Sequence, residues 1–321
     1  MHKEFLMGNA AIALGAVAAG VNVVAGYPGT PSTEVLETIA KHRPDDVYVE
    51  WSVNEKAAME LAAGASYAGA RSMVTMKQVG LNVASDPLMS LEYVGIKGGM
   101  VILVADDPGP ISSQTEQDTR HFSRFSKLPC FDPSSAQEAY EMIQEAFEYS
   151  EKYGTPVFLR PTTRVCHGYA SIMVKDETEY THHQPEGFIK DSKRWVIFPR
   201  LSFMNHKKIE ARNQELSDIF SSYEKNTIHP SCDAFKDSKK GIATGGISYT
   251  YTMETLKKTG MVKTLKIATP HPFPEKLAVD FLSGLDEVLC LEELDPVIER
   301  ELIYICGKYH LPTRINGKLS G

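Results

Sequence analysis

Apolar residues recur along the chain with two alternating periods, which predicts strands and helices in regular succession. Short apolar or β-branched runs predict strands, and apolar residues three or four positions apart predict helices. Runs such as Met100–Ala105 are apolar on both faces, as buried parallel strands are. Strands are expected at 21–25, 47–51, 72–76, 99–105 and 155–160, and helices at 9–19, 33–41, 54–69, 82–92, 117–124 and 135–152. Residues 1–165 are therefore expected to form a doubly wound α/β domain.

The regular succession stops after residue 165 and resumes near residue 239. Residues 166–238 are expected to be a linker or insert with a charged helix near 205–220, and no functional site is predicted there. The adjacent His182 and His183 have no third ligand at a defined spacing, so a solvated linker is favoured over a metal site. In 239–321, strands are expected at 241–244, 264–268 and 287–291, and helices at 249–258, 274–284 and 296–308. These residues are predicted to form a smaller parallel α/β domain.

The stretch from Val47 to Asn82 contains the most informative acidic residue. Val47, Val49 and Trp51 are expected to form a buried strand, and helical spacing begins near Ser52. Glu55 therefore lies in the first turn of a helix, just past the C-terminal end of a strand, where open parallel sheets bind ligands. The spacing from Ser52 to Glu55 also fits a capping box, and position alone favours that structural role.

The loops that follow the strands contain further candidate residues. The first loop, Gly26–Thr33, has two prolines and two glycines around the Thr30 hydroxyl, although it also fits an ordinary helix start. A second turn, Lys77–Asn82, contains Gly80, which would permit close backbone approach by a ligand. The third, Ala105–Pro110, is expected to be a rigid acidic turn with a structural role. No dinucleotide-binding fingerprint or P-loop accompanies these loops.

Composition and charge narrow the classes of partner. The chain has 321 residues, enough for about two domains, with 34 Lys and Arg against 41 Asp and Glu. Its net charge of −7 argues against nucleic acid and anionic membranes as partners. Glu4, Asn9 and Asn22 interrupt the apolar N-terminal stretch, so a helix and a strand are expected there instead of a signal peptide or membrane span. The five scattered cysteines predict neither disulfides nor a metal site, and a cytoplasmic protein is expected.

Several strings resemble a known family. They are Tyr27–Ser32 (YPGTPS), Asn54-Glu55, Ala63–Arg71 (AGASYAGAR) and Met76–Asn82 (MKQVGLN). Together they resemble the pyrimidine-binding domain of the 2-oxoacid:ferredoxin oxidoreductases, and among these the alpha subunit of the indolepyruvate type. The strings at Ala243–Tyr249 and Glu292–Pro296 resemble the same subunit further along. Residues 239–321 accordingly resemble a transketolase-C-terminal-like domain.

The resemblance implies roles for individual residues. Glu55 matches the catalytic glutamate that contacts the aminopyrimidine ring of thiamine diphosphate, and Thr30 matches a residue near the substrate carboxylate. Pro28, Gly29, Gly80 and Asn82 are implied to line the cofactor pocket. Relatives that act on pyruvate place an arginine on a later loop, where this chain has Asp106 and Asp107. This departure favours an aryl pyruvate such as indolepyruvate, and it leaves the partner of the substrate carboxylate unidentified.

The resemblance also implies partners. The diphosphate of the cofactor and its Mg²⁺ would be held by a diphosphate-binding domain or subunit whose Gly-Asp-Gly motif this chain lacks, so a truncated chain or a split gene is expected. The complete complex, a homo- or hetero-oligomer with a beta subunit, would use iron–sulfur clusters and CoA to form aryl-acetyl-CoA, passing electrons to ferredoxin. Two alternatives stay open. One is the alpha chain of a non-oxidative 2-oxoacid decarboxylase, and the other is a non-catalytic assembly subunit.

Overall fold

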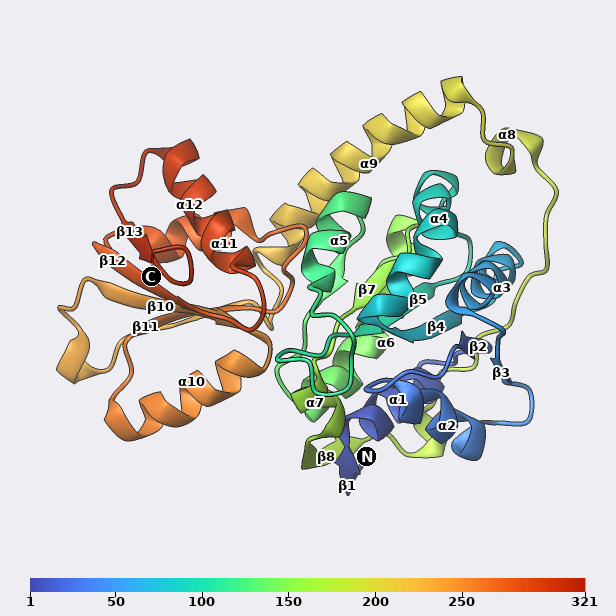
Figure 1. Cartoon of the computed structure of the whole chain (residues 1–321), viewed down its shortest axis with the longest axis horizontal. Helices are drawn as coiled ribbons and strands as arrows, with labels where there is room; N and C mark the ends of the chain where they lie inside the picture. The colour runs from blue at the N-terminus through green and yellow to red at the C-terminus, as the bar shows by residue number, and fades with distance from the viewer. Residues whose placement is uncertain (321) are drawn as a thin grey trace.

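The computed structural model describes residues 1–320, which form two main sheets one after the other along the chain (Figure 1). The first sheet has six strands, all parallel, in the order β3-β2-β4-β5-β7-β6. They are β2 (Val23–Gly26), β3 (Tyr48–Trp51), β4 (Ser72–Lys77), β5 (Met100–Ala105), β6 (Cys130–Phe131) and β7 (Val157–Leu159). The predicted doubly wound α/β fold is confirmed.

Helices cover both faces of this sheet. One face is covered by α1 (Gly8–Ala18), α2 (Thr33–His42) and α6 (Ala136–Tyr153), which share a core containing Ile12, Val35 and Ile143. The other is covered by α3 (Glu55–Tyr67), α4 (Gln78–Val94) and α5 (Thr119–Ser126), whose core includes Met59 and Leu88. Because α2 and α4 leave the adjacent strands β2 and β4 on opposite faces, the connections diverge at the C-terminal ends of these strands, and this point is called the crevice below. Open α/β sheets bind ligands at such a point.

The prediction of a buried strand at 47–51 is only partly correct. Val47 is buried, but Val49 is half-buried and the Trp51 side chain is 39% exposed. The reason is that β3 pairs with β2 alone and forms an edge of the sheet. An edge strand needs fewer buried side chains than the central strands β4 and β5.

The prediction of a turn at Lys77–Asn82 is wrong. Strand β4 runs to Lys77, and α4 begins at the next residue, Gln78. Gly80 therefore lies in the first turn of a helix that was expected to begin only at residue 82. A glycine in a helix interior lowers helix propensity, which accounts for the late start that the sequence predicts.

Residues 166–238 contain more regular structure than a linker needs. Strand β8 (Tyr169–Val174) pairs antiparallel with β1 (His2–Met7), although neither strand was expected. After α7 (Thr163–His167) and α8 (Ser192–Trp195), the long helix α9 (Pro199–Phe220) runs along the first unit towards the second sheet (Figure 1). Arg212 on α9 is tied to Glu92 on α4 by an ion pair of 2.8 Å.

The second sheet has five strands in the order β13-β12-β10-β11-β9. They are β9 (Thr227–His229), β10 (Lys240–Gly245), β11 (Lys263–Ile267), β12 (Glu287–Leu291) and β13 (Arg314–Asn316), with helices α10 (Gly246–Thr259), α11 (Glu275–Leu282) and α12 (Val297–Tyr309). The predicted parallel arrangement holds for four strands, but β9 pairs antiparallel with β11. No helix among residues 1–320 is long and apolar enough to cross a membrane.

The two sheets meet through buried charged side chains. Arg120 at the start of α5 contacts Asp118 at 2.6 Å and Glu292 from the second unit at 2.7 Å. The Glu292 carboxylate also accepts hydrogen bonds from the first backbone amides of α12. The string at Glu292–Pro296 that resembles the family is thus a contact between the two units.

The Gly245-Gly246 pair also serves this contact. Gly246, the first residue of α10, has a φ of +52°, and a Cβ there would lie 3.1 Å from a carboxylate oxygen of Asp132 in the first unit. Asp132 in turn lies 3.3 Å from the buried Arg160 guanidinium. A pair of glycines at a helix start could bind an anion, and in the structure the anionic group beside Gly246 is the Asp132 side chain of the protein itself.

Candidate active site

Glu55 is a buried residue whose carboxylate has no hydrogen-bonding partner among the described residues. Glu55 is the first residue of α3 and is 8% exposed. The helix is capped by Asn54, whose Oδ1 accepts from the Ala57 amide at 2.9 Å, while the Ser52 hydroxyl donates to Glu50. The capping-box role considered for Glu55 is therefore wrong. Within residues 1–320 the Glu55 carboxylate forms no hydrogen bond or ion pair, so its oxygens remain available to a ligand.

Gly80 makes room for this carboxylate. A Cβ built on Gly80 would lie 2.4 Å from Glu55 Oε1 and 2.7 Å from Glu55 Cγ, both far inside van der Waals contact. The sequence predicted that a ligand would approach Gly80 closely, and in the structure the Glu55 side chain occupies this position. The absence of a Cβ at Gly80 lets two helix starts, those of α3 and α4, meet at one point with the acid between them.

The loop after β2 lies against the start of α4. A Cβ on Gly29 would be 3.0 Å from Lys77 Cγ, so this loop packs on the Lys77 side chain. Thr30 is exposed, and its carbonyl oxygen lies 3.5 Å from the Ser112 hydroxyl of a later loop. Pro28 is exposed as well. The structure therefore brings Gly29 and Gly80 to the same helix start and leaves the Thr30 side chain open to solvent nearby.

The segment between β5 and α5 covers the other side of this helix start. Gln78 Nε2 donates to the Thr115 carbonyl at 3.1 Å, and Asn82 Nδ2 donates to Gln117 Oε1 at 3.1 Å. Asn82 is exposed and is bonded to this segment. Sequence reasoning missed Lys77 and Gln78 as candidates. The available signal resembled the one that singled out Glu55, because both residues lie where a helix starts after an apolar strand.

Asp106 and Asp107 have structural roles, as the rigid turn expected there requires. Asp106 is fully buried and accepts hydrogen bonds from Arg160 Nε at 2.6 Å and from the Thr119 amide at 3.0 Å. Asp107 accepts from the Ser112 and Ser113 amides and fixes the start of the covering segment. Although burial opposes it, these hydrogen bonds hold the pKa of Asp107 below its usual range.

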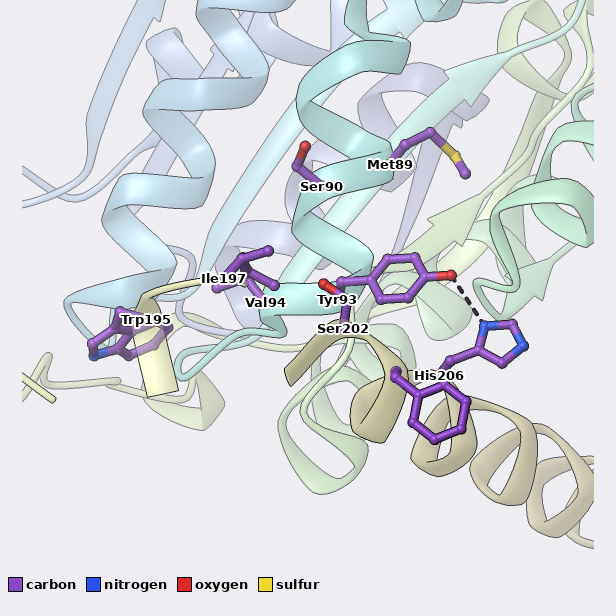
Figure 2. A pocket seen from close by; sticks show the side chains of 9 residues that line it. Met89, Ser90, Tyr93, Val94, Trp195, Ile197, Ser202 and His206 are labelled. Carbon is purple, nitrogen blue, oxygen red and sulfur yellow. Dashed lines mark hydrogen bonds between the residues drawn. The ribbon is translucent and has the colours of Figure 1, made fainter. Parts of the chain in front are cut away.

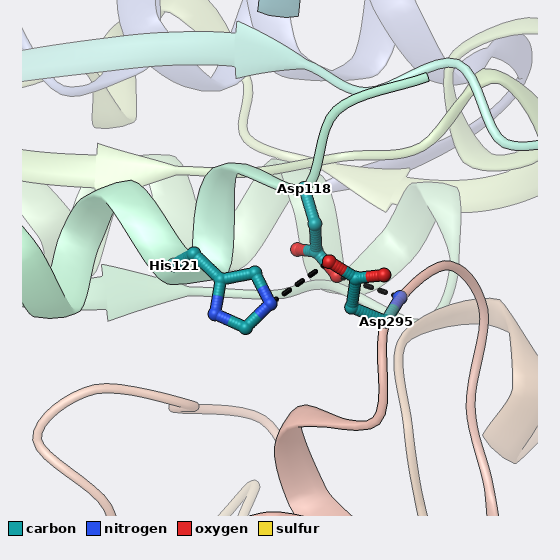
Figure 3. A group of neighbouring side chains, drawn as sticks. All are labelled: Asp118, His121 and Asp295. Atoms are coloured by element: carbon teal, nitrogen blue, oxygen red, sulfur yellow. Dashed lines mark hydrogen bonds and ion pairs between the residues drawn. The ribbon is translucent and has the colours of Figure 1, made fainter. Parts of the chain in front are cut away.

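Asp118, His121 and Asp295 approach one another with metal-like spacing (Figure 3). The His121 ring nitrogen lies 2.9 Å from Asp295 Oδ2, and Asp118 accepts from the Asp295 amide at 3.1 Å. Burial opposes ionisation of Asp118, but Arg120 and Arg160 outweigh it and hold the pKa of this carboxyl below its usual range. Two guanidinium groups beside the carboxylate would repel a cation. The group is best described as a contact between the two units.

An apolar hollow of about 640 Å³ lies between α4 and the segment that begins α9 (Figure 2). Its lining contains none of the predicted site residues; it includes Met89, Tyr93, Trp195, Phe203 and His206. Tyr93 belongs to the last turn of α4, roughly 20 Å along the helix from Gly80 at 1.5 Å per residue. This hollow is therefore separate from the crevice that holds Glu55.

A family model described as "Pyruvate flavodoxin/ferredoxin oxidoreductase, thiamine diP-bdg" matches residues 14–230. The chain belongs to this family of oxidoreductases. The match includes Thr30, Glu55, Lys77 and Gly80, so all of the crevice described above lies inside the thiamine diphosphate-binding region of the family.

Two relatives align with almost the whole of this chain. The chain is 43% identical over 324 residues to "Indolepyruvate oxidoreductase subunit IorA" of Methanothermobacter thermautotrophicus, covering 99% of this chain and 51% of the relative. It is 40% identical over 323 residues to the subunit of the same name from Pyrococcus horikoshii, covering 99% and 49%. The chain thus spans about half the length of these relatives.

A solved oxidoreductase has the same fold. It is the 2-oxoglutarate:ferredoxin oxidoreductase of Magnetococcus marinus, described with 2-oxoglutarate, coenzyme A and succinyl-CoA bound. The TM-score is 0.76 at 17% identity, with 98% of this chain and 62% of that chain covered. At this identity the similarity establishes the fold.

The crevice suits one part of a thiamine diphosphate site. The unpartnered Glu55 carboxylate offers an acceptor for a ring N–H, and Gly80 keeps the space beside it clear of a side chain. Burial raises the pKa of the Cys130, Cys166 and Cys290 thiols above the usual range, so these cysteines are protonated in the protein as described.

Proposed function

We propose that this chain supplies the pyrimidine-binding half of the active site of an indolepyruvate:ferredoxin oxidoreductase. The observation that carries the proposal is the Glu55 carboxylate, buried at the mouth of a parallel sheet, free of partners among the described residues and packed on Gly80. The names of the relatives support the choice of an aryl pyruvate as substrate. The proposed products are aryl-acetyl-CoA and reduced ferredoxin.

In this proposal the role of Glu55 is to hold one proton at the pyrimidine ring. Thiamine diphosphate, when bound, supplies the electron sink that lets a 2-oxoacid lose carbon dioxide. Glu55 would accept or donate a hydrogen bond at the ring nitrogen, and partial burial makes such a bond stronger than in water. Gly29, Pro28, Gly80 and Asn82 would shape the pocket around the ring, and the Thr30 hydroxyl would face the substrate.

The other components are proposed to come from outside these residues. The diphosphate and Mg²⁺ would be held by a diphosphate-binding domain or subunit, because the crevice offers no cluster of oxygen ligands for a divalent ion among residues 1–320. Iron–sulfur clusters, a beta subunit and ferredoxin would complete the electron path. Residues 239–321 would support the assembly of this complex, and residues 166–238 would link them to residues 1–165.

Turnover by the assembled complex tests the function. Indolepyruvate, pyruvate and 2-oxoglutarate are each supplied with CoA and ferredoxin, and reduced ferredoxin, acyl-CoA and aldehyde are measured. The proposal predicts ferredoxin reduction with indolepyruvate as the preferred substrate. Release of aldehyde without ferredoxin reduction would instead indicate a non-oxidative decarboxylase. Equal turnover by a complex that lacks this chain would indicate an assembly subunit.

A further inference from the structure

We propose that Lys77 binds the carboxylate of the 2-oxoacid substrate. This inference rests on the proposed function, and it assigns the group that the sequence left unidentified. Relatives that act on pyruvate are expected to place an arginine on the loop after β5, where this chain has Asp106 and Asp107. These two side chains cannot bind the substrate carboxylate, because they are anions that bind Arg160 and backbone amides. Among residues 1–320, a cation for this role would have to come from another element at the same edge of the sheet.

Lys77 lies where the two candidate loops meet. It is the last residue of β4 and the N-cap of α4, three residues before Gly80. Its methylene groups pack under the loop after β2, where a Cβ on Gly29 would be 3.0 Å from Lys77 Cγ and 3.2 Å from Lys77 Cδ. Thr30 follows Gly29 directly. The Lys77 side chain therefore lies against the loop that carries Thr30, beside the helix start where Gly80 packs on Glu55.

The charge of Lys77 has no acidic partner within residues 1–320. Its Nζ lies 3.3 Å from Gln114 Oε1, a neutral acceptor, although the lysine is half-buried. Two other lysines withdrawn from solvent are paired with carboxylates, Lys97 with Glu186 and Lys225 with Glu145, whereas Lys263 donates to backbone carbonyls. The Lys77 ammonium can therefore bind an anionic group without breaking an ion pair among the described residues.

The side-chain amide of Gln78, next to Lys77, has only one of its two polar atoms hydrogen-bonded. Gln78 is 2% exposed, and its Nε2 donates to the Thr115 carbonyl. Its Oε1 is buried without a partner among the described residues. The first amides of the 17-residue helix α4 add positive potential at this point. An unpaired cation and a helix start together fit an anionic ligand group, whereas the free Gln78 Oε1 is an acceptor and could bind only a hydrogen-bond donor.

A cation is needed here because of Glu55. The crevice already contains one carboxylate, and a second carboxylate brought in by the substrate would be repelled at short range in a partly buried site. Lys77 would offset this repulsion and fix which end of the substrate faces the loop after β2. The aryl group would then extend away from Lys77.

The test compares an anionic ligand with its neutral analogue in the complete enzyme. The ligands are an aryl lactate, in which a hydroxyl replaces the keto oxygen of the substrate, and the corresponding lactamide. Calorimetry gives both dissociation constants for the wild type and for Lys77→Met, Lys77→Gln and Lys77→Arg. Lys152→Met is the matched control, since Lys152 is an exposed lysine in the last turn of α6 with no acidic partner within residues 1–320.

Loss of the Lys77 charge should weaken the binding of the anionic ligand and leave the binding of its neutral analogue unchanged. Lys77→Met and Lys77→Gln are expected to raise the dissociation constant of the lactate and the KM for the 2-oxoacid by about 10- to 100-fold. The affinity for the lactamide and for thiamine diphosphate should stay within about twofold, which also verifies folding, and Lys77→Arg should recover most of the lactate affinity.

Two negative outcomes are distinguishable. If the wild-type complex turns over 2-oxoacids but the Lys77 variants match Lys152→Met, or lose lactate and lactamide affinity equally, Lys77 does not bind the carboxylate and the proposed function stands. If the wild-type complex turns over no 2-oxoacid, the proposed function fails and the role of Lys77 fails with it.

Discussion

At the scale of single residues, the site depends on which side chain caps α3. Asn54 accepts the hydrogen bond from the Ala57 amide, so the acid one position later is released from capping. The sequence alone could not decide this, because Ser52, Asn54 and Glu55 all suit the start of a helix. The backbone places Ser52 before the cap, where its hydroxyl donates to Glu50. Glu55 is left facing Gly80.

Replacing Gly80 with alanine should displace the carboxylate. The new Cβ would lie 2.4 Å from Glu55 Oε1 and 2.8 Å from Glu55 Cδ, so the side chain must move by more than a few tenths of an ångström. Small displacements of a reacting group are costly, and turnover of the complete enzyme should fall by about 10- to 100-fold. Steady-state kinetics and thiamine diphosphate calorimetry measure this loss.

Gly307→Ala is the matched control for that change. Gly307 also lies in a helix, α12, but nothing is within 4 Å of a Cβ there. Its replacement should stabilise the protein by up to about 1 kcal/mol, as alanine does in helix interiors, and leave turnover unchanged. If Gly80→Ala behaves like Gly307→Ala in both assays, the close packing of Glu55 on Gly80 has no functional importance.

At the scale of elements, apolar periodicity located the longer helices and most strands of both sheets, but it missed the short strands β6, β9 and β13. Periodicity was less successful where contacts with other elements determine the burial of a strand or the first residue of a helix. The exposure of Trp51 follows from the edge position of β3, and the early start of α4 follows from the packing of Gly80 on Glu55. Strands β1 and β8 were missed because each is stabilised by a partner more than 160 residues away. None of these contacts is visible in a local pattern.

The contact between α4 and α9 should make stability depend on pH. Burial raises the pKa of Glu92 from its usual 4.5 to about 7, despite the ion pair with Arg212. The folded state therefore binds this proton more tightly than the unfolded state. The contribution of protonated Glu92 to the free energy of unfolding is present at low pH and is lost as pH rises from about 5 to 8. This loss of stability is on the order of 2 kcal/mol.

Glu92→Gln should remove that part of the pH dependence. The expected result is a free energy of unfolding, measured by urea denaturation, that falls less between pH 5 and pH 8 than in the wild type. Glu148→Gln, at an exposed position of α6, should keep the wild-type slope. An unchanged slope in Glu92→Gln would mean that Glu92 is ionised throughout this range.

At the scale of the whole molecule, the two sheets are joined by buried ion pairs. Arg120, Asp118 and Glu292 are almost fully buried, although Glu292 lies more than 170 residues after the other two. The strings that contain Gly246 and Glu292 could be recognised as family features in the sequence. Their purpose could not be inferred, because it depends on contacts with Asp132 and Arg120 in the other unit.

Removing Arg120 should destabilise the whole molecule. Arg120→Met leaves the Asp118 and Glu292 carboxylates buried without their main partner, a change that typically costs about 3–5 kcal/mol. Urea denaturation measures the loss. Arg124→Met is the control, because the Arg124 guanidinium is exposed and its pair with Glu301 should contribute less than about 1 kcal/mol. Equal effects of the two changes would contradict a structural role for the buried network.

The central claim is that the carboxylate of Glu55 acts in catalysis, and Glu55→Gln in the complete enzyme tests it most directly. Ferredoxin reduction with a 2-oxoacid is measured alongside Glu60→Gln, an exposed glutamate on the same helix. The account predicts that Glu55→Gln lowers turnover by about 100-fold or more while the complex stays assembled, and that Glu60→Gln has no effect. Undiminished turnover in Glu55→Gln would contradict it.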